Sequence, residues 1–299
     1  MSDYNQLGVL VVNYFAYQNV RDLLLSSVGH SGSADVTFSI VDNSCDDVEW
    51  RNLKAECESI DGLKVVLTRS SYNAGYAGGN NLAAMALGHL SPAALVVINP
   101  DVSIRSGVFS DLLAEVLLAP TVLFGASTKS GSRELSGIAA ISCLSGRSIE
   151  LEVWPKRLRI PHVAYPSGHF IALSSQMWRD LGGFDESYFL YSEEADMVLR
   201  SARLDGSIAV TRSIEIEHAG GLTTGSMHGG GTRSDITLYH ATRSRVLLFR
   251  KHRSIRRYLP TVFGARLAWS CAVLFRQGSR AFRQVIRGLA SGLLGPANG

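Results

Sequence analysis

The chain has 299 residues, of which 46% are hydrophobic and 18% are charged, a balance typical of a globular protein that excludes a disordered chain. Its formal net charge of +3 conceals an asymmetry, because residues 240–299 hold twelve of the 29 basic residues and none of the 26 acidic ones. A basic tail of this kind usually contacts an anionic surface, either a membrane or a nucleic acid.

The amino-terminal third of the chain alternates strand and helix patterns. In chain order, we predict strands at residues 7–12, 36–41, 63–67 and 94–98, with helices at 20–28 and 48–60. A glycine-rich loop at 73–81 would open a third helix that ends near residue 90. This alternation predicts an α/β fold built on a mostly parallel, doubly wound sheet. The strands are continuous apolar runs, which favours a sheet covered on both faces.

Three of these predicted strands end on polar side chains. Asn13, Asp42 and the Asn99–Asp101 tripeptide follow directly on their strands. Ligands of parallel α/β sheets bind at the carboxyl ends of the strands. Asn and Asp also favour turns for purely local reasons. Three such ends in one half of a domain nevertheless favour a binding site.

The second half is less regular. We predict strands at 167–173 and 207–217, helices at 174–181 and 193–204, and further strands within 127–165. Residues 219–231 hold six glycines, which is typical of a lid over a site.

The segment 182–200 carries the strongest chemical signal. A glycine pair and an aromatic turn deliver Glu193, Glu194 and Asp196 to the start of a predicted helix. The helix dipole and the free N–H groups of that first turn stabilise carboxylates in their ionised form. A carboxylate held there can act as a general base toward a hydroxyl group.

Several ordered motifs together resemble one enzyme family. They are Val-Val-Asn-Tyr, Val-Asp-Asn-Ser, Asn-Ala-Gly-Tyr-Ala-Gly-Gly-Asn-Asn, Asn-Pro-Asp, Ser-Gly-His-Phe, Glu-Glu-Ala-Asp and Glu-His-Ala-Gly-Gly. In this order they resemble the family 2 inverting glycosyltransferases, and most of all the rhamnosyltransferase branch. The resemblance implies a GT-A fold over residues 1–254, with a nucleotide-binding half at 1–105 and an acceptor-binding half at 106–254. Residues 255–299 would form a basic amphipathic helical extension.

The resemblance also implies a set of donor-binding residues. They are Asn13, Asp42, Asn73, Gly75, Asn81, Asn99, Asp101, Gly168 and His169. Asp42 matches the position that binds the donor's base.

The Asn99-Pro100-Asp101 tripeptide stands where the family carries an Asp-x-Asp metal motif. Asp101 would bind Mg²⁺ or Mn²⁺ at the donor diphosphate, and His218 matches a histidine that completes this site. Asn99 departs from the family's first aspartate, which leaves the metal dependence open.

The resemblance makes Glu194 the general base, although the family carries the shorter aspartate there. Glu193 and Asp196 are the alternatives, and the spacing of Asp196 and Arg200 also predicts an ion pair along the helix. Asp185 would cap the turn or bind the acceptor. The glycines at 75, 78 and 79 do not match the dinucleotide fingerprint, which argues against a dehydrogenase.

The predicted activity is transfer of a sugar, with L-rhamnose from dTDP-rhamnose as the first choice, to a glycan or polyprenyl-linked glycan in bacterial cell-surface polysaccharide synthesis. A UDP-sugar such as UDP-galactofuranose remains an alternative donor. A protein that binds a nucleotide sugar without turnover is a second alternative.

The basic tail predicts where the enzyme works. Arg276, Arg280, Arg283 and Arg287 fall on one face of a helical pattern, which is typical of helices on anionic membrane surfaces. We expect a cytoplasmic protein, peripheral on the inner face of the cell membrane. A helix packed on the domain is the alternative, and no nucleic-acid motif accompanies the tail.

The remaining sequence signals agree with a cytoplasmic location. The cysteines show neither disulfide nor metal spacing, which favours a reducing compartment. We expect no signal peptide, because residues 1–6 are polar and the apolar run at 7–12 is too short.

Overall fold

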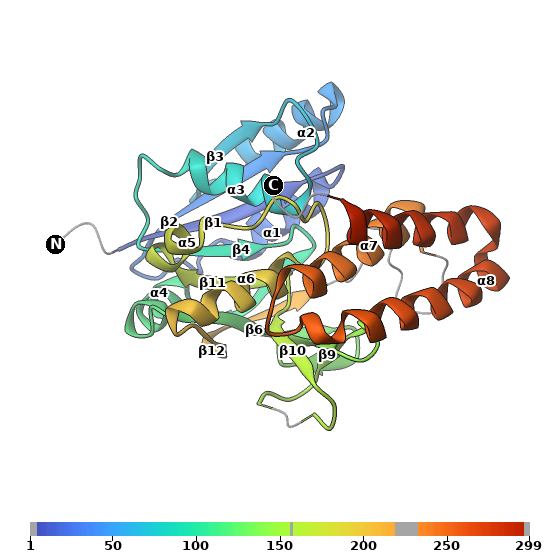
Figure 1. Cartoon of the computed structure of the whole chain (residues 1–299). Coiled ribbons are helices and arrows are strands. Elements are labelled where there is room, and N and C mark those ends of the chain that lie inside the picture. The colour runs from blue at the N-terminus through green and yellow to red at the C-terminus, as the bar shows by residue number, and fades with distance from the viewer. Residues whose placement is uncertain (1–4, 156–157, 219–232, 296–299) are drawn as a thin grey trace.

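The computed structural model describes residues 5–155, 158–218 and 233–295. A large mixed sheet of nine strands forms its centre, with helices on both faces, and a smaller three-stranded sheet lies beside it (Figure 1). The large sheet has the order β3-β2-β1-β4-β11-β6-β12-β5, with β7 paired to β6, and the small sheet has the order β10-β8-β9.

The strands are β1 (Gln6–Asn13), β2 (Asp35–Asp42), β3 (Lys64–Arg69), β4 (Ala94–Ile98), β5 (Val102–Gly107), β6 (Val122–Ser130), β7 (Arg133–Leu135), β8 (Ile138–Ser142), β9 (Ser148–Leu151), β10 (His162–Pro166), β11 (Phe170–Ser174) and β12 (Ser207–His218). The α-helices are α1 (Tyr17–Ser27), α2 (Asp47–Glu58), α3 (Gly75–Ala86), α4 (Phe109–Leu118), α5 (Ser175–Leu181), α6 (Glu193–Ser201), α7 (Asp235–Lys251) and α8 (Leu259–Leu294). Two short 3-10 helices, η1 (Ala202–Leu204) and η2 (Arg256–Tyr258), complete the described elements.

The amino-terminal half has the predicted parallel pairing. Strand β1 pairs in parallel with β2 and β4, and β2 pairs in parallel with β3. The β1–β2 register places Asn13 directly beside Asp42, so two of the predicted strand ends meet at one edge. Beyond β4 the sheet becomes mixed, because β11 runs antiparallel to β4 and β12 runs antiparallel to β5.

Two hydrophobic layers enclose the sheet. Alternate residues of β1, such as Val9 and Val11, pack with α1, α2 and α4 on one face. Leu10, which points to the opposite face, packs with α3, α5 and α6. This double coverage explains why the strands read as continuous apolar runs.

The glycine-rich segment 73–81 differs from its prediction. It was expected to be a loop, but α3 begins at Gly75 and includes the rest of it. The glycines inside the helix allow close packing, since a Cβ on Gly79 would lie 2.8 Å from both Val12 and Asn43. The glycines of this segment therefore allow α3 to pack closely against the large sheet. Helix α4 and strand β5 were not predicted from the sequence.

The carboxyl-terminal helices project from the body of the protein as a pair (Figure 1). Leu238 and Val246 of α7 pack against Val273, Val285 and Leu289 of α8.

Within α8, Gly278 has φ +84° and divides the helix into a first arm, residues 259–277, and a second arm, residues 279–294. The predicted basic stripe is therefore interrupted, because Arg276 precedes the break and Arg280 follows it. Residues 256–294 are long and apolar enough to cross a membrane by composition alone, but this break divides them into two shorter helices.

Candidate functional site

The segment Gly168–His169, between β10 and β11, connects the two predicted chemical centres. The backbone carbonyl of His169 accepts a hydrogen bond of 3.1 Å from the backbone N–H of Asn99. On the other side, a Cβ added to Gly168 would overlap the carboxylate of Glu194. The predicted base and the Asn-Pro-Asp turn thus lie on either side of one dipeptide.

Asp101 and His218 lie together, as the sequence predicts. Nε2 of His218 is 3.3 Å from Oδ2 of Asp101, whose side chain is 3% exposed. The other carboxylate oxygen, Oδ1, is buried and has no hydrogen-bond partner among the described residues. An orphaned buried oxygen beside an imidazole fits a divalent cation, and Mg²⁺ commonly takes one or two protein ligands together with substrate phosphates. No cluster of three or more metal-ligating side chains occurs in the described part of the chain.

His169 supports this pair. Its ring stacks on that of His218, with centroids 4.6 Å apart, and its Nε2 lies 2.9 Å from the hydroxyl of Thr128. Burial, and secondarily the neighbouring His218, hold the pKa of His169 well below its usual value. His169 is therefore neutral at neutral pH and orients His218 without adding positive charge.

Glu194 is placed as a general base should be. It lies in the first turn of α6 and remains partly exposed. Burial raises its pKa to about 7, while hydrogen bonding to its own backbone and the positive charge of Arg245 act in the opposite direction. A carboxylate that titrates near neutral pH is well matched to proton abstraction.

The two alternative bases are placed differently. Glu193 is 2% exposed, and burial together with the charge of Glu194 holds its pKa well above the usual value, so it keeps its proton. Asp196 is fully buried, and its two oxygens are bound by Nε of Arg200 at 2.6 Å and Nε2 of His252 at 2.7 Å. The predicted ion pair between Asp196 and Arg200 is confirmed, and it leaves Asp196 no free oxygen for a substrate.

The amino-terminal strand ends form a buried network. Nδ2 of Asn13 donates to Asp42 at 3.1 Å and to Glu49 at 2.9 Å. Asp42 also accepts bonds from the backbone N–H and the hydroxyl of Ser44, both at 3.0 Å. Because Asp42 has no exposed surface, the structure assigns it to positioning of the loop, and its contact with a donor base stays a prediction.

The predicted donor residues of α3 instead join the two halves of the molecule. The side chain of Asn73 accepts a 2.9 Å bond from the N–H of Gly75, the first residue of α3. Gly75 has φ +70° and packs against the backbone of Phe189, and the next N–H, from Tyr76, donates to that same carbonyl at 2.8 Å.

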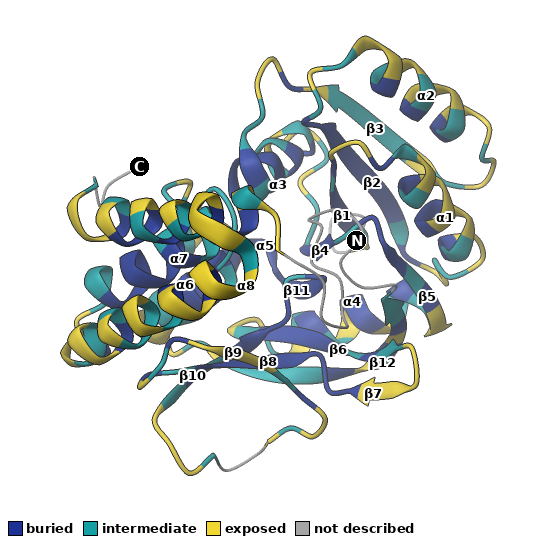
Figure 2. Ribbon diagram, turned by 90° about the vertical axis from the view of Figure 1, so that its right-hand side faces the viewer, coloured by how far each residue is buried: buried dark blue, intermediate teal, exposed yellow. Residues whose placement is uncertain are grey.

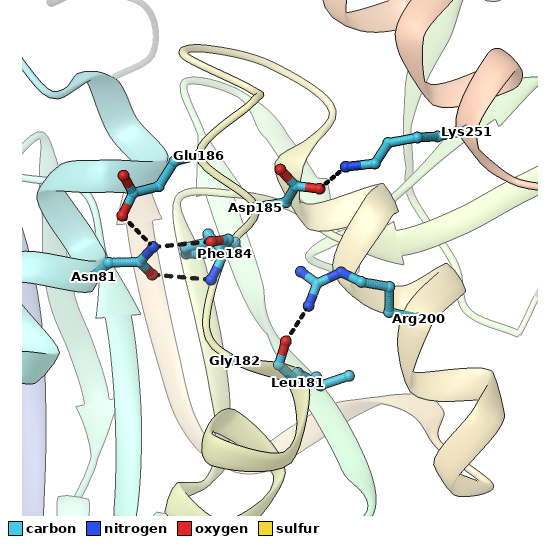
Figure 3. A pocket seen from close by; sticks show the side chains of 8 residues that line it. All are labelled: Asn81, Leu181, Gly182, Phe184, Asp185, Glu186, Arg200 and Lys251. Atoms are coloured by element: carbon cyan, nitrogen blue, oxygen red, sulfur yellow. Dashed lines mark hydrogen bonds and ion pairs between the residues drawn. The ribbon is translucent and has the colours of Figure 1, made fainter. Parts of the chain in front are cut away.

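Asn81 binds the turn before α6, and its predicted contact with the donor stays a prediction. Its amide makes three hydrogen bonds of 2.9 Å, two with the backbone of Phe184 and one with the carboxylate of Glu186 (Figure 3). It therefore fixes the turn before α6. Asp185 accepts a 2.9 Å bond from the N–H of Ser187 and pairs with Lys251, which confirms its capping role.

A cavity of about 480 Å³ lies at this junction, lined by Asn81, Leu181, Gly182, Phe184, Asp185, Glu186, Arg200 and Lys251 (Figure 3). Its charged groups already have partners: Asp185 pairs with Lys251, Arg200 binds Asp196 and two backbone carbonyls, and Glu186 accepts from Asn81. We therefore assign this cavity a structural role.

Some residues of the site were missed by the sequence analysis. The hydroxyl of Tyr76 donates to the carbonyl of Gly168 at 2.5 Å, and the charges of Glu194 and Asp101 both act on it. Glu49 could have been found, because it stands three residues after the helix cap Asp46, the spacing of a capping pair. The exposed aromatic pair Tyr14 and Phe15 follows β1 and lies beside the same strand ends. The predicted lid, 219–231, lies outside the described residues.

Comparison with known proteins agrees with the fold. No family model matches the chain. A low-salt glycan biosynthesis hexosyltransferase of Haloferax volcanii, Agl10, is 24% identical over 227 residues, which cover 72% of this chain and 67% of that protein.

Solved structures resemble the chain over almost its whole length. GalNAc-T7 with UDP, GalNAc and Mn²⁺ matches with a TM-score of 0.65 at 12% identity, covering 95% of this chain and 55% of that one. The Pyrobaculum calidifontis mannosyltransferase PcManGT with GDP-Man and Mn²⁺ matches with a TM-score of 0.56 at 14% identity, covering 96% and 87%. S. aureus TarS residues 1–349 with UDP-GlcNAc match with a TM-score of 0.57 at 13% identity, covering 96% and 80%. The fold is that of the GT-A glycosyltransferases, as the sequence predicts.

Proposed function

We propose that the chain is an inverting glycosyltransferase in which Glu194 is the general base. The observation that carries the proposal is the position of Glu194, which has a pKa raised to about 7 and contacts Gly168 beside the Asp101–His218 pair. The relative from Haloferax volcanii is named a hexosyltransferase, and the structural neighbours are glycosyltransferases, which supports the same activity.

The reaction is a single displacement. Glu194 takes the proton from an acceptor hydroxyl, whose oxygen forms a bond to the anomeric carbon as the bond from that carbon to the diphosphate breaks. The nucleoside diphosphate leaves with the bonding electron pair, and the sugar configuration inverts. Gly168 leaves room for the carboxylate, because any larger side chain would occupy its position.

Asp101 and His218 would hold a divalent cation, Mg²⁺ or Mn²⁺, whose charge would stabilise the leaving diphosphate. Two of the structural neighbours were solved with Mn²⁺. Asn99 contributes no negative charge, so we expect this cation to bind weakly before the nucleotide sugar does.

The donor sugar follows from the sequence resemblance alone. We propose dTDP-L-rhamnose first, with UDP-sugars such as UDP-galactofuranose as competitors. Structural neighbours were solved with UDP, UDP-GlcNAc and GDP-Man, so a useful panel must vary the base as well as the sugar. A glycan, or a glycan on a polyprenyl carrier, is the proposed acceptor.

We also propose that the first arm of α8 lies on the surface of an anionic membrane. Its outward face carries no charge between residues 260 and 275 and exposes Leu267, Leu274 and Phe275, the last at 87% (Figure 2). Exposed arginines flank this face, at Arg256 and Arg257 before it and at Arg276, Arg280 and Arg283 after it. An apolar stripe between basic ends fits the boundary between lipid tails and anionic headgroups.

Sedimentation with vesicles tests the membrane proposal. Phe275→Glu should lose binding to vesicles of phosphatidylglycerol and phosphatidylethanolamine, whereas Leu118→Glu on α4, also 87% exposed, should keep it. Equal binding by the two variants, or no preference of the wild type for phosphatidylglycerol over phosphatidylcholine, would refute it.

Nucleotide release from a panel of nucleotide sugars, with and without Mn²⁺ or Mg²⁺, tests the enzymatic proposal. We expect metal-dependent release from one donor. Donor binding without release, even with a crude lipid acceptor, would favour a binding protein without turnover. Failure to bind any nucleotide sugar would contradict both the glycosyltransferase and the binding protein without turnover.

A further inference from the structure

A group of arginines lies in the carboxyl-terminal part of the chain, most of it within the half that is expected to bind the acceptor, and has no role in the proposed reaction. Arg245 of α7 and Arg266 of α8 come together at Gly146, in the turn between β8 and β9. Arg147 follows that turn, and Arg233 precedes α7. We name these four residues the arginine cluster. They come from three separate segments, so no single stretch of sequence reveals them.

The two inner arginines are buried with unused donors. Arg245 is 5% exposed, its Nη2 donates to the hydroxyl of Ser148 at 2.6 Å, and the Tyr165 side chain also interacts with its guanidinium. Its Nε and Nη1 are buried without a well-formed hydrogen bond among the described residues. Arg266 donates to the carbonyl of Gly146, and its Nε is likewise buried without a partner. Leaving a buried guanidinium donor unpaired is destabilising, because the donor loses its hydrogen bonds to water on burial and forms none with the protein.

The charge of the cluster is only partly compensated, because the charges of Glu194 and Glu193 act on Arg245 without forming an ion pair. None of the four arginines forms an ion pair with a carboxylate in the described parts of the chain. Burial and the neighbouring arginines, Arg245 first, lower the pKa of Arg266 to about 9. Like charges at close range repel one another, an anion between them would relieve that repulsion, and guanidinium groups match phosphate oxygens in geometry.

We propose that the arginine cluster binds a phosphate or diphosphate group of the acceptor. This inference rests on the proposed function, because it names the acceptor chemistry of the same site. Arg245 connects the cluster with the proposed base, since its charge acts on Glu194. The exposed Arg147 and Arg233 would meet the anion first, and Arg245 and Arg266 would supply the buried donors.

A different role for Arg245 is to balance the charge of Glu194 and nothing more. That role predicts no binding of anions at Arg266 or Arg147, whose charges are not among those that shift the pKa of Glu194. Anion binding at Arg266 and Arg147 therefore distinguishes the anion-binding role from the charge-balancing role.

Trp269 provides a local signal for the test. The guanidinium carbons of Arg266 and Arg233 lie 5.5 and 5.8 Å from its ring centroid. We would titrate the full chain, in EDTA and without donor, with inorganic pyrophosphate, farnesyl diphosphate and farnesol, and record tryptophan fluorescence. Trp269→Phe identifies the part of the signal that comes from the cluster.

Both diphosphates should change the Trp269 signal, and farnesol should not. Arg266→Gln should raise the Kd at least about tenfold, because it removes a charge-assisted donor. Arg147→Gln should raise it about twofold to threefold and, being exposed, cannot act through misfolding. Arg253→Gln, an exposed arginine outside the cluster, is the matched control.

Tighter binding of farnesyl diphosphate than of pyrophosphate would identify a lipid-linked acceptor, and equal binding would identify a phosphate carried on the glycan. A Trp269 signal that responds to neither diphosphate would overturn the proposal. So would a Kd unchanged in both Arg266→Gln and Arg147→Gln. Because no donor is present, the result is independent of whether transfer itself is observed.

Discussion

Replacing Glu194 with glutamine should abolish transfer and yet stabilise the fold at alkaline pH. The pKa of this carboxyl rises from its ordinary 4.5 to about 7 in the folded chain, chiefly through burial. The folded state therefore holds the proton more tightly than the unfolded state. The destabilising cost of ionisation is absent below pH 4.5, grows as the pH rises, and is complete above about pH 7.

The pKa difference sets the size of the effect. A rise of about 2.5 in the pKa corresponds to a loss of about 3 kcal/mol in the free energy of unfolding. We expect about 2 kcal/mol, because the side chain is partly exposed. Glu194→Gln should gain that much free energy of unfolding at pH 8, and about a quarter of it at pH 5.

Urea denaturation at the two pH values measures this gain, with Asp196→Ala as a control that should lose stability at both. A glutamine variant less stable than wild type at pH 8 would refute the reasoning. A gain that does not depend on pH would refute it equally.

Further predictions concern the surroundings of the base. Gly168→Ala should lower the rate of nucleotide release at least tenfold with donor affinity retained, since the new methyl group would displace the Glu194 carboxylate; a rate near wild type would show that the carboxylate lies elsewhere. Asp196→Ala should cost about 3 kcal/mol in urea denaturation, because it leaves Arg200 without its buried partner; a cost below about 1 kcal/mol would contradict this. Asp101→Asn should raise the Mn²⁺ concentration needed for half-maximal release at least tenfold, and an unchanged Mn²⁺ requirement would remove Asp101 from the metal site.

Local patterns predicted the parts of the fold that depend on neighbouring residues. The apolar runs and their polar ends located β1, β2 and β4, and parallel pairing then brought Asn13 beside Asp42. The helical spacing of Asp196 and Arg200 predicted their ion pair. His252, which binds the other oxygen of Asp196, is 56 residues away and carried no signal.

Tertiary packing decided the features that the sequence did not reveal. Asn81 and Gly75 match a donor-binding motif, yet their contacts are with Phe184 and Phe189, more than 100 residues further along the chain. The regular spacing of basic residues in the tail predicted one helix, but the backbone breaks at Gly278.

The central claim is that Glu194 removes the acceptor proton, and the pH dependence of turnover tests it most directly. We would measure nucleotide release at saturating donor and acceptor from pH 5.5 to 9 for the wild type and Glu194→Gln. The account predicts a wild-type rate that rises with pH through an apparent pKa near 7. It also predicts a glutamine variant at least about 100-fold slower, with no such rise and with unchanged donor affinity. A variant that keeps the wild-type rate and the same pH dependence would contradict the account.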